Sequence, residues 1–194
     1  TAIPQEILGG VNSFTLLAIP IYIFAGELME TGGISRRILT LAHNLVGHIR
    51  GGLGHVVVVA TLLLSGISGS STADTAAIGT AMIPTMEDKG YKREKAVAIV
   101  AACGGMDILV PPCLTMIILG GVANLSVESL FFGGLLPALV MSLALMIVIY
   151  FDAIKNNIPQ SSWKGIGAVG SSFAKAFWAL MIPVIILGGI RLGA

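Results

Sequence analysis

Five long apolar segments, separated by shorter polar links, dominate this chain of 194 residues. They cover residues 13–29, 51–84, 96–123, 130–151 and 173–190. Charged side chains make up 11% of the sequence, whereas they are about a quarter of an average soluble domain. A helix crosses the hydrocarbon core of a bilayer with about 20 apolar residues. These segments therefore predict an all-α integral membrane protein that lies in a lipid bilayer.

The basic residues are concentrated in three of the links, which sets the expected topology. Ten of the 11 lysines and arginines fall there or, in the case of Lys175, at the start of the apolar segment that follows: Arg36, Arg37, Arg50, Lys89, Lys92, Arg93, Lys95, Lys155, Lys164 and Lys175. Basic residues in short loops favour the cytoplasmic side of a membrane. The three basic links are therefore predicted to be cytoplasmic, with residues 1–12 and 124–129 outside. The net charge of +1 gives no reason to expect a nucleic-acid partner.

The second apolar segment starts and ends at basic links, so it must cross the membrane an even number of times or not at all. Two crossings need about 40 apolar residues, and residues 51–84 are too few. We predict a re-entrant hairpin over residues 51–88, with its tip at Gly69, Ser70 and Ser71. Non-helical backbone at that depth is tolerated only inside protein or beside a water-filled cavity. The tip is therefore predicted to lie in the protein interior.

The third apolar segment must cross once, but helix-breaking residues interrupt it. Gly104 and Gly105 weaken a helix, and Pro111 and Pro112 remove two backbone donors. Residues 94–124 are therefore predicted to form a broken helix, with an unwound linker around Asp107. Proline is favoured at a helix start, so the second half is predicted to begin near the two prolines.

The hairpin tip and the linker together predict a binding site near the middle of the membrane. Free helix-end carbonyls coordinate cations, and helix N-termini attract anionic groups. Ser68, Ser70 and Asp74 are the candidate Na⁺ ligands. The wider candidate site for sodium and substrate adds Gly69, Ser71, Gly104, Gly105, Asp107, Pro111 and Pro112. The alternative is that the serines and Asp74 only satisfy the start of a buried helix; no organic cofactor is predicted.

Residues 34–50 have an amphipathic pattern. The apolar residues at spacings of three or four are Ile34, Ile38, Leu41, Leu45 and Ile49, and the other faces carry Arg36, Arg37, His43 and Asn44. This pattern predicts either a helix at the membrane interface or a loop helix packed on the protein. The three histidines have no metal-ligand spacing, and Cys103 and Cys113 are expected to be buried thiols.

A series of short motifs runs through the chain in a defined order. They are Ala25-Gly26-Glu27-Leu28-Met29, Gly32-Gly33-Ile34-Ser35-Arg36-Arg37, Ser68-Gly69-Ser70-Ser71-Thr72-Ala73-Asp74-Thr75-Ala76-Ala77-Ile78-Gly79, Ile83-Pro84, Lys89-Gly90-Tyr91, Pro111-Pro112 and Pro183-Val184-Ile185-Ile186-Leu187-Gly188-Gly189-Ile190. In this order and spacing they resemble the large membrane (permease) subunit of tripartite ATP-independent periplasmic (TRAP) transporters. The resemblance covers essentially the whole chain.

This resemblance implies a multi-pass protein of the bacterial inner membrane and not an enzyme. It implies half of an elevator-type transporter with inverted repeats, in which residues 34–50 form the arm helix. The expected segments around it are a scaffold span within 1–33, a span at 128–151 and a truncated span at 173–194. The implied function is Na⁺-coupled import of an organic acid, delivered by a periplasmic solute-binding protein, with a small four-helix membrane subunit as a further partner.

Two positions depart from the family pattern, and two other functions stay open. The family usually has a small residue where Asp107 stands and a serine where Cys113 stands. Asp107 is therefore either an added cation ligand or proton site, or a residue facing a water-filled cavity. An intramembrane aspartyl protease could use Asp74 and Asp107 as a dyad, but such a site is expected to have glycine where Met106 stands. An ion channel is the other alternative.

Overall fold

The computed structural model describes residues 20, 23–24, 26–28, 31–156, 158, 163 and 165–192. The predicted scaffold span within residues 1–33 lies mostly outside this part of the chain. The described residues form helices, turns and short links, with no strand among them. The elements with defined bounds are α3 (Ile34–Val46), α4 (Gly52–Ser68), α5 (Ser71–Asp88), α6 (Arg93–Asp107), α7 (Leu114–Ala123), α8 (Val127–Lys155) and α9 (Ile166–Leu192).

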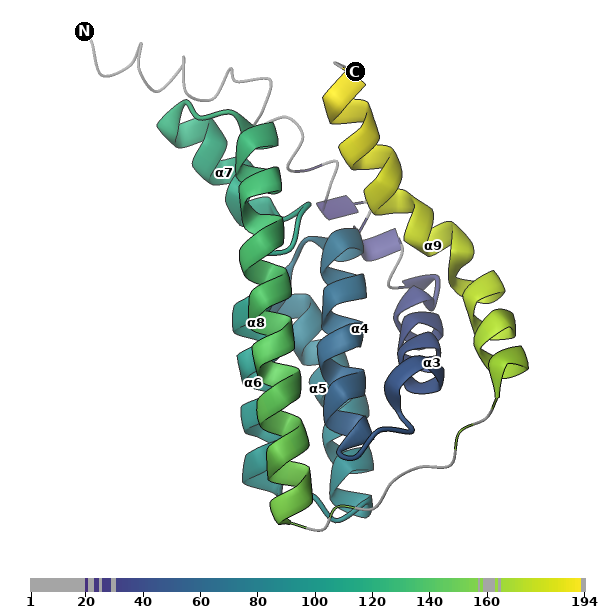
Figure 1. Ribbon diagram of the computed structural model, residues 1–194. Coiled ribbons are helices and arrows are strands. Elements are labelled where there is room, and N and C mark those ends of the chain that lie inside the picture. Colours follow the sequence, from purple (N-terminus) through teal and green to yellow (C-terminus); the bar gives the residue numbers. More distant parts are fainter. Residues whose placement is uncertain are drawn as a thin grey trace, which may run out of the picture.

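Helix α4 is the centre of the bundle. It contacts α3, α5, α6, α8 and α9, which surround it (Figure 1). Its sequence is apolar on all sides, so it lacks the polar face of a surface helix. Val57, Val58 and Ala60 are completely buried in the core that it organises. Most of its side chains are therefore buried against the surrounding helices, whereas Val59, Leu62 and Leu63 are partly exposed.

Helices α8 and α9 are long and apolar enough to cross a membrane, judged by length and composition. The spans are Val127–Lys155, with a mean hydropathy of 2.4, and Ile166–Gly189, with 1.7. Large apolar side chains on their outer faces are exposed, for example Leu136 at 70% and Val148 at 64%. Helix α8 extends beyond the predicted span 128–151 at both ends, and α9 starts before the predicted span 173–194. Helix α9 begins earlier because its first turns pack on α3.

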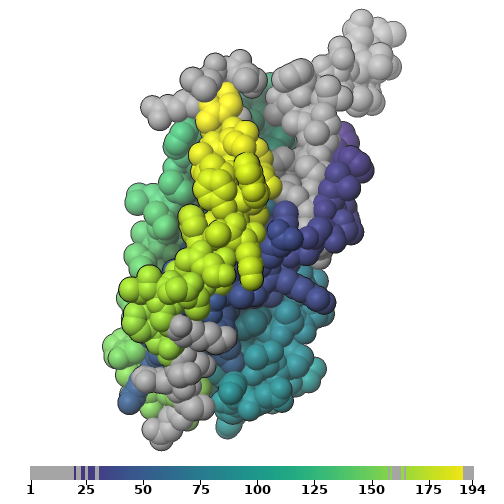
Figure 2. Space-filling model, turned by 90° about the vertical axis from the view of Figure 1, so that its right-hand side faces the viewer, coloured from purple at the N-terminus to yellow at the C-terminus, as the bar shows by residue number. Residues whose placement is uncertain are grey.

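Helix α3 differs from the predicted amphipathic helix in its end and in its buried face. It ends at Val46, with Gly47 as its C-cap, and not at residue 50. Leu45 is 40% exposed, whereas Asn44, expected on a polar face, is buried. The reason is a polar contact with α9, because the Asn44 amide donates to Ser172 Oγ over 2.6 Å. Figure 2 shows this face of the molecule, where α9 lies along α3.

The helix ends that carry the basic links lie together at one end of the bundle. Figure 1 shows the α3–α4 link, the α5–α6 link and the end of α8 there. At this end Lys95 Nζ of α6 lies 2.5 Å from Asp152 Oδ1 of α8. The hairpin formed by α4 and α5 turns back partway along α8, well away from this end (Figure 1).

Candidate functional site

The reversal between α4 and α5 depends on one glycine. Helix α4 ends at Ser68, and Gly69 adopts a left-handed conformation with φ of 63°. Its N–H donates to Ser65 O over 3.1 Å, which closes the last turn of α4. Ser70 is extended, and α5 begins at Ser71. Glycine adopts a left-handed backbone conformation without a steric cost, so Gly69 permits the sharp turn.

Ser68 organises the tip through two hydrogen bonds. Its hydroxyl donates to Asp74 Oδ2 over 2.5 Å and accepts from the Ser70 N–H over 3.1 Å. Asp74 thus reaches back from the first turn of α5 to the end of α4, and its side chain is buried. The Ser70 hydroxyl could have capped the start of α5, but it makes no cap hydrogen bond. Its Oγ lies 3.4 Å from Thr72 Oγ1. The hydroxyl of Ser68 satisfies a backbone donor at the tip instead.

The break in the third apolar segment lies later than predicted. Helix α6 continues through Gly104 and Gly105 to Asp107, and residues 108–113 are not helical. Helix α7 begins at Leu114, after both prolines, so neither proline occupies a helix start. The glycines do not unwind α6, because Gly104 is a close-packing position against Thr75 of α5. Gly105 is exposed, and a Cβ added there would meet no atom within 4 Å.

The hairpin tip and the linker contact each other directly. The N–H of Leu114, the first residue of α7, donates to Gly69 O over 3.2 Å. Ser65 Oγ donates to Asp107 O over 2.9 Å and approaches Val110 O at 3.4 Å. Ser65 was not among the predicted site residues. It lies in the same run of small residues, one helical turn before Ser68, and this spacing could have identified it.

Two buried carboxylates lie at this junction. Asp107 is 1% exposed, and its Oδ1 has no hydrogen-bond partner among the described residues. Asp74 is 4% exposed and interacts electrostatically with Asp107. Two acidic side chains in a buried junction are costly to ionise together unless a positive group or hydrogen bonds stabilise them. Carboxylate, hydroxyl and carbonyl oxygens are the donors that hard cations prefer.

The ends of α6, α5 and α7 give the junction a mixed polarity. Helix α6 ends at Asp107, so its last carbonyls lie at the junction, whereas α5 and α7 begin there, and the first N–H groups of a helix have no partner within that helix. No group of three or more His, Cys, Asp or Glu side chains occurs in the described part of the chain. Oxygen donors beside helix N-termini suit a hard cation next to an anionic group.

Neighbouring elements enclose the tip. The backbone of Gly66 lies so close to Pro183 of α9 that an added Cβ would be 3.1 Å from the proline Cγ. The same Cβ would be 3.5 Å from Pro111 O in the linker. Gly26 is also close to the tip, because a Cβ added there would lie 3.2 Å from Ser68 O. Of the predicted site residues, the fold thus brings together Ser68, Gly69, Ser70, Asp74, Asp107 and Pro111.

The contact between α5 and α6 provides a test with an internal control. In Gly104→Ala the new methyl group would collide with the Thr75 side chain, so we expect a stability loss of about 1–3 kcal/mol. Thr75→Ala should restore most of it, because the colliding hydroxyl and methyl are then absent. Gly105→Ala should not destabilise, since its Cβ meets open space. Thermal unfolding in detergent of Gly104→Ala, of Gly104→Ala combined with Thr75→Ala, and of Gly105→Ala measures these stability changes. Equal losses for Gly104→Ala and Gly105→Ala would contradict the packing.

The family comparison matches the whole chain. Residues 1–194 match the family model described as "Tripartite ATP-independent periplasmic transporter, DctM component". The chain is 39% identical over 189 residues to the 2,3-diketo-L-gulonate TRAP transporter large permease protein YiaN of Escherichia coli (strain K12), covering 97% of this chain and 44% of the relative.

Two further relatives are similar over nearly the same region. The sialic acid TRAP transporter large permease protein SiaM of Vibrio cholerae is 42% identical over 192 residues, covering 97% of this chain and 44% of the relative. The C4-dicarboxylate TRAP transporter large permease protein DctM of Pseudomonas aeruginosa is 41% identical over 181 residues, covering 93% and 42%. The chain spans less than half the length of these relatives.

Proposed function

Because this chain belongs to the family of the DctM component of tripartite ATP-independent periplasmic transporters, we propose that it forms part of a permease that imports an organic acid with Na⁺. The family membership makes it part of an integral membrane transporter and not of an enzyme. Asp74 and Asp107 are accordingly assigned to transport and not to a protease dyad.

The observation that carries the Na⁺ proposal is the buried junction between tip and linker. It combines Asp107, whose Oδ1 has no hydrogen-bond partner among the described residues, with Asp74, which is also buried and accepts from Ser68 Oγ. A Na⁺ ion there would place positive charge beside two buried carboxyl groups. We propose Ser68, Asp74 and Asp107 as its ligands. Ser70 is retained as a ligand candidate, since its hydroxyl is not committed to capping α5.

The proposed substrate class rests on two observations. The names of these relatives refer to diketogulonate, sialic acid and C4-dicarboxylates, all of which are organic acids. In this chain, α5 and α7 both begin at the junction, and their N-terminal N–H groups favour a carboxylate. None of the predicted site residues is basic. We propose that helix N-termini and the bound cation, rather than a Lys or Arg of this segment, neutralise the substrate.

The arrangement of helices supports the proposed membrane orientation. The α3–α4 link, the α5–α6 link and the end of α8 meet at one end of the bundle, which we assign to the cytoplasm of a multi-pass protein in the bacterial inner membrane (Figure 1). The α4–α5 hairpin turns back partway along α8, as expected for a re-entrant element, and residues 108–113 divide a broken helix. Helix α3 is the proposed arm of an elevator. A small four-helix membrane subunit and a periplasmic solute-binding protein are the proposed partners.

Uptake into proteoliposomes tests the proposal. The complete permease, its membrane partner and its binding protein loaded with an organic acid are combined with an inward Na⁺ gradient or a matched K⁺ gradient. We expect accumulation of the acid above its external concentration only with Na⁺, because coupled binding is required for concentrative transport. Equal accumulation with K⁺ would refute Na⁺ coupling. Rapid equilibration without accumulation would instead identify a channel.

A further inference from the structure

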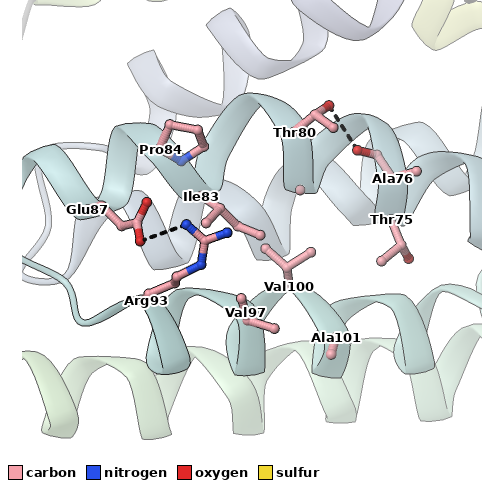
Figure 3. Close-up of a pocket in the computed structure, with 11 residues that line it drawn as sticks. Thr75, Ala76, Thr80, Ile83, Pro84, Glu87, Arg93, Val97, Val100 and Ala101 are labelled. Carbon is pink, nitrogen blue, oxygen red and sulfur yellow. Dashed lines mark hydrogen bonds and ion pairs between the residues drawn. The ribbon is translucent and has the colours of Figure 1, made fainter.

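An open groove runs between α5 and α6 on the outside of the bundle. Its volume is about 470 Å³, within the range of about 300–1,000 Å³ that small-molecule sites have. Gly79 of α5 and Val100 of α6 are buried and form its floor. Figure 3 shows Ile83 and Val97 facing each other across it from the two helices. The groove exists because Gly79 has no side chain to fill the space above Val100.

The two ends of the groove differ in charge. At the end near the α5–α6 link, Arg93 Nη1 lies 3.4 Å from Glu87 Oε1 (Figure 3). The Arg93 side chain is 73% exposed, so this ion pair contributes little to stability and can exchange its partner. Lys89 and Lys92 lie in the same link, flanked by the acidic Asp88 and Glu94, while Lys95 is paired with Asp152. The rest of the groove, toward Thr75, is mainly apolar.

The length of the groove matches one leaflet of a bilayer. Thr75 and Glu87 lie about 18 Å apart along α5, at about 1.5 Å per residue. Half of a hydrocarbon core about 30 Å thick is about 15 Å. An acyl chain that starts at the level of Arg93 would therefore reach the inner end of the groove. A soluble anion would use only the charged end and leave the apolar walls uncovered.

We propose that this groove binds an anionic phospholipid of the cytoplasmic leaflet, with the phosphate on Arg93 in place of Glu87 and one acyl chain between α5 and α6. Basic pockets between membrane helices on the cytoplasmic side are suited to such headgroups. The inference goes beyond transport itself, but it rests on the proposed orientation, in which the link between α5 and α6 is cytoplasmic.

Native mass spectrometry of the complete permease tests the site. Dioleoyl-phosphatidylglycerol and dioleoyl-phosphatidylcholine are titrated separately, and we expect tighter binding of the anionic lipid. Arg93→Gln should weaken phosphatidylglycerol binding about fivefold, and Arg93→Lys should restore most of it. Glu87→Gln should strengthen binding, because Arg93 then has no competing carboxylate. Lys155→Gln, the same charge change at the end of α8, is the matched control and should bind like the unmodified protein.

A second pair of variants tests the acyl chain separately from the charge. Ala101 lines the groove, whereas Ala98 on the same helix does not. Ala101→Leu should reduce phosphatidylglycerol binding, and Ala98→Leu should leave it intact. The inference is wrong if Arg93→Gln and Lys155→Gln behave alike, if the two lipids bind equally, or if inorganic phosphate alone displaces the lipid. Na⁺-dependent uptake is measured on the same preparation, so equal binding of the two lipids by the unmodified protein, with intact uptake, would overturn only this inference.

Discussion

Replacing Asp74 with asparagine is expected to raise the Na⁺ concentration for half-maximal uptake about 10- to 100-fold. Asparagine keeps the size of the side chain but removes the charge that Ser68 Oγ contacts at 2.5 Å. A hydrogen bond to a charged group contributes about 1.5–3 kcal/mol, and a factor of ten in affinity corresponds to about 1.4 kcal/mol. The measurement is uptake by the complete transporter in proteoliposomes over a range of Na⁺ concentrations.

The controls for Asp74 separate a binding role from a structural one. Asp88→Asn makes the same change at the exposed end of α5 and should leave the Na⁺ dependence unaltered. Ser68→Ala should shift the Na⁺ dependence in the same direction as Asp74→Asn, since it removes the hydroxyl that positions the carboxylate. An unchanged Na⁺ dependence in Asp74→Asn would remove this residue from the cation site. A shift of equal size in Asp88→Asn would show that surface charge alone is responsible.

Gly134→Ala is expected to destabilise the protein and to reduce uptake. An added Cβ at Gly134 of α8 would lie 2.6 Å from Leu109 O in the linker and would also collide with Met116 of α7. Because one of these atoms belongs to the backbone, no side-chain rotation can relieve the contact. Overpacking of this kind costs about 1–3 kcal/mol. The measurements are thermal unfolding in detergent and Na⁺-dependent uptake.

The neighbouring glycine supplies a matched control for this prediction. Gly133 lies on the same helix, and its added Cβ would meet no atom within 4 Å. Gly133→Ala should be neutral or stabilising by about 0.5–1 kcal/mol, because alanine favours a helix interior over glycine. If both variants unfold at the same temperature, the linker is not held against α8 as the structure has it.

The differences between expectation and structure have a common cause. The spacing of apolar residues predicted an exposed Asn44, but its amide pairs with Ser172, which is more than 100 positions away in the chain. Glycines predicted unwinding at Gly104, but a glycine inside a helix also permits close packing, and here Thr75 occupies the space. Local propensity cannot distinguish these outcomes, because it contains no information about which element lies opposite.

Sequence alone determined the helical membrane class, the position of the turn at Gly69 and the interruption before α7. These follow from composition and from backbone chemistry, since membrane helices need about 20 apolar residues and only a few residue types reverse or break a chain. Tertiary structure decided that Ser68 rather than Ser70 organises the tip, that Leu114 donates to Gly69 O, and that Asp107 is buried with a partnerless oxygen. Those contacts depend on how α4, α6 and α7 pack in space, which no local pattern of residues specifies.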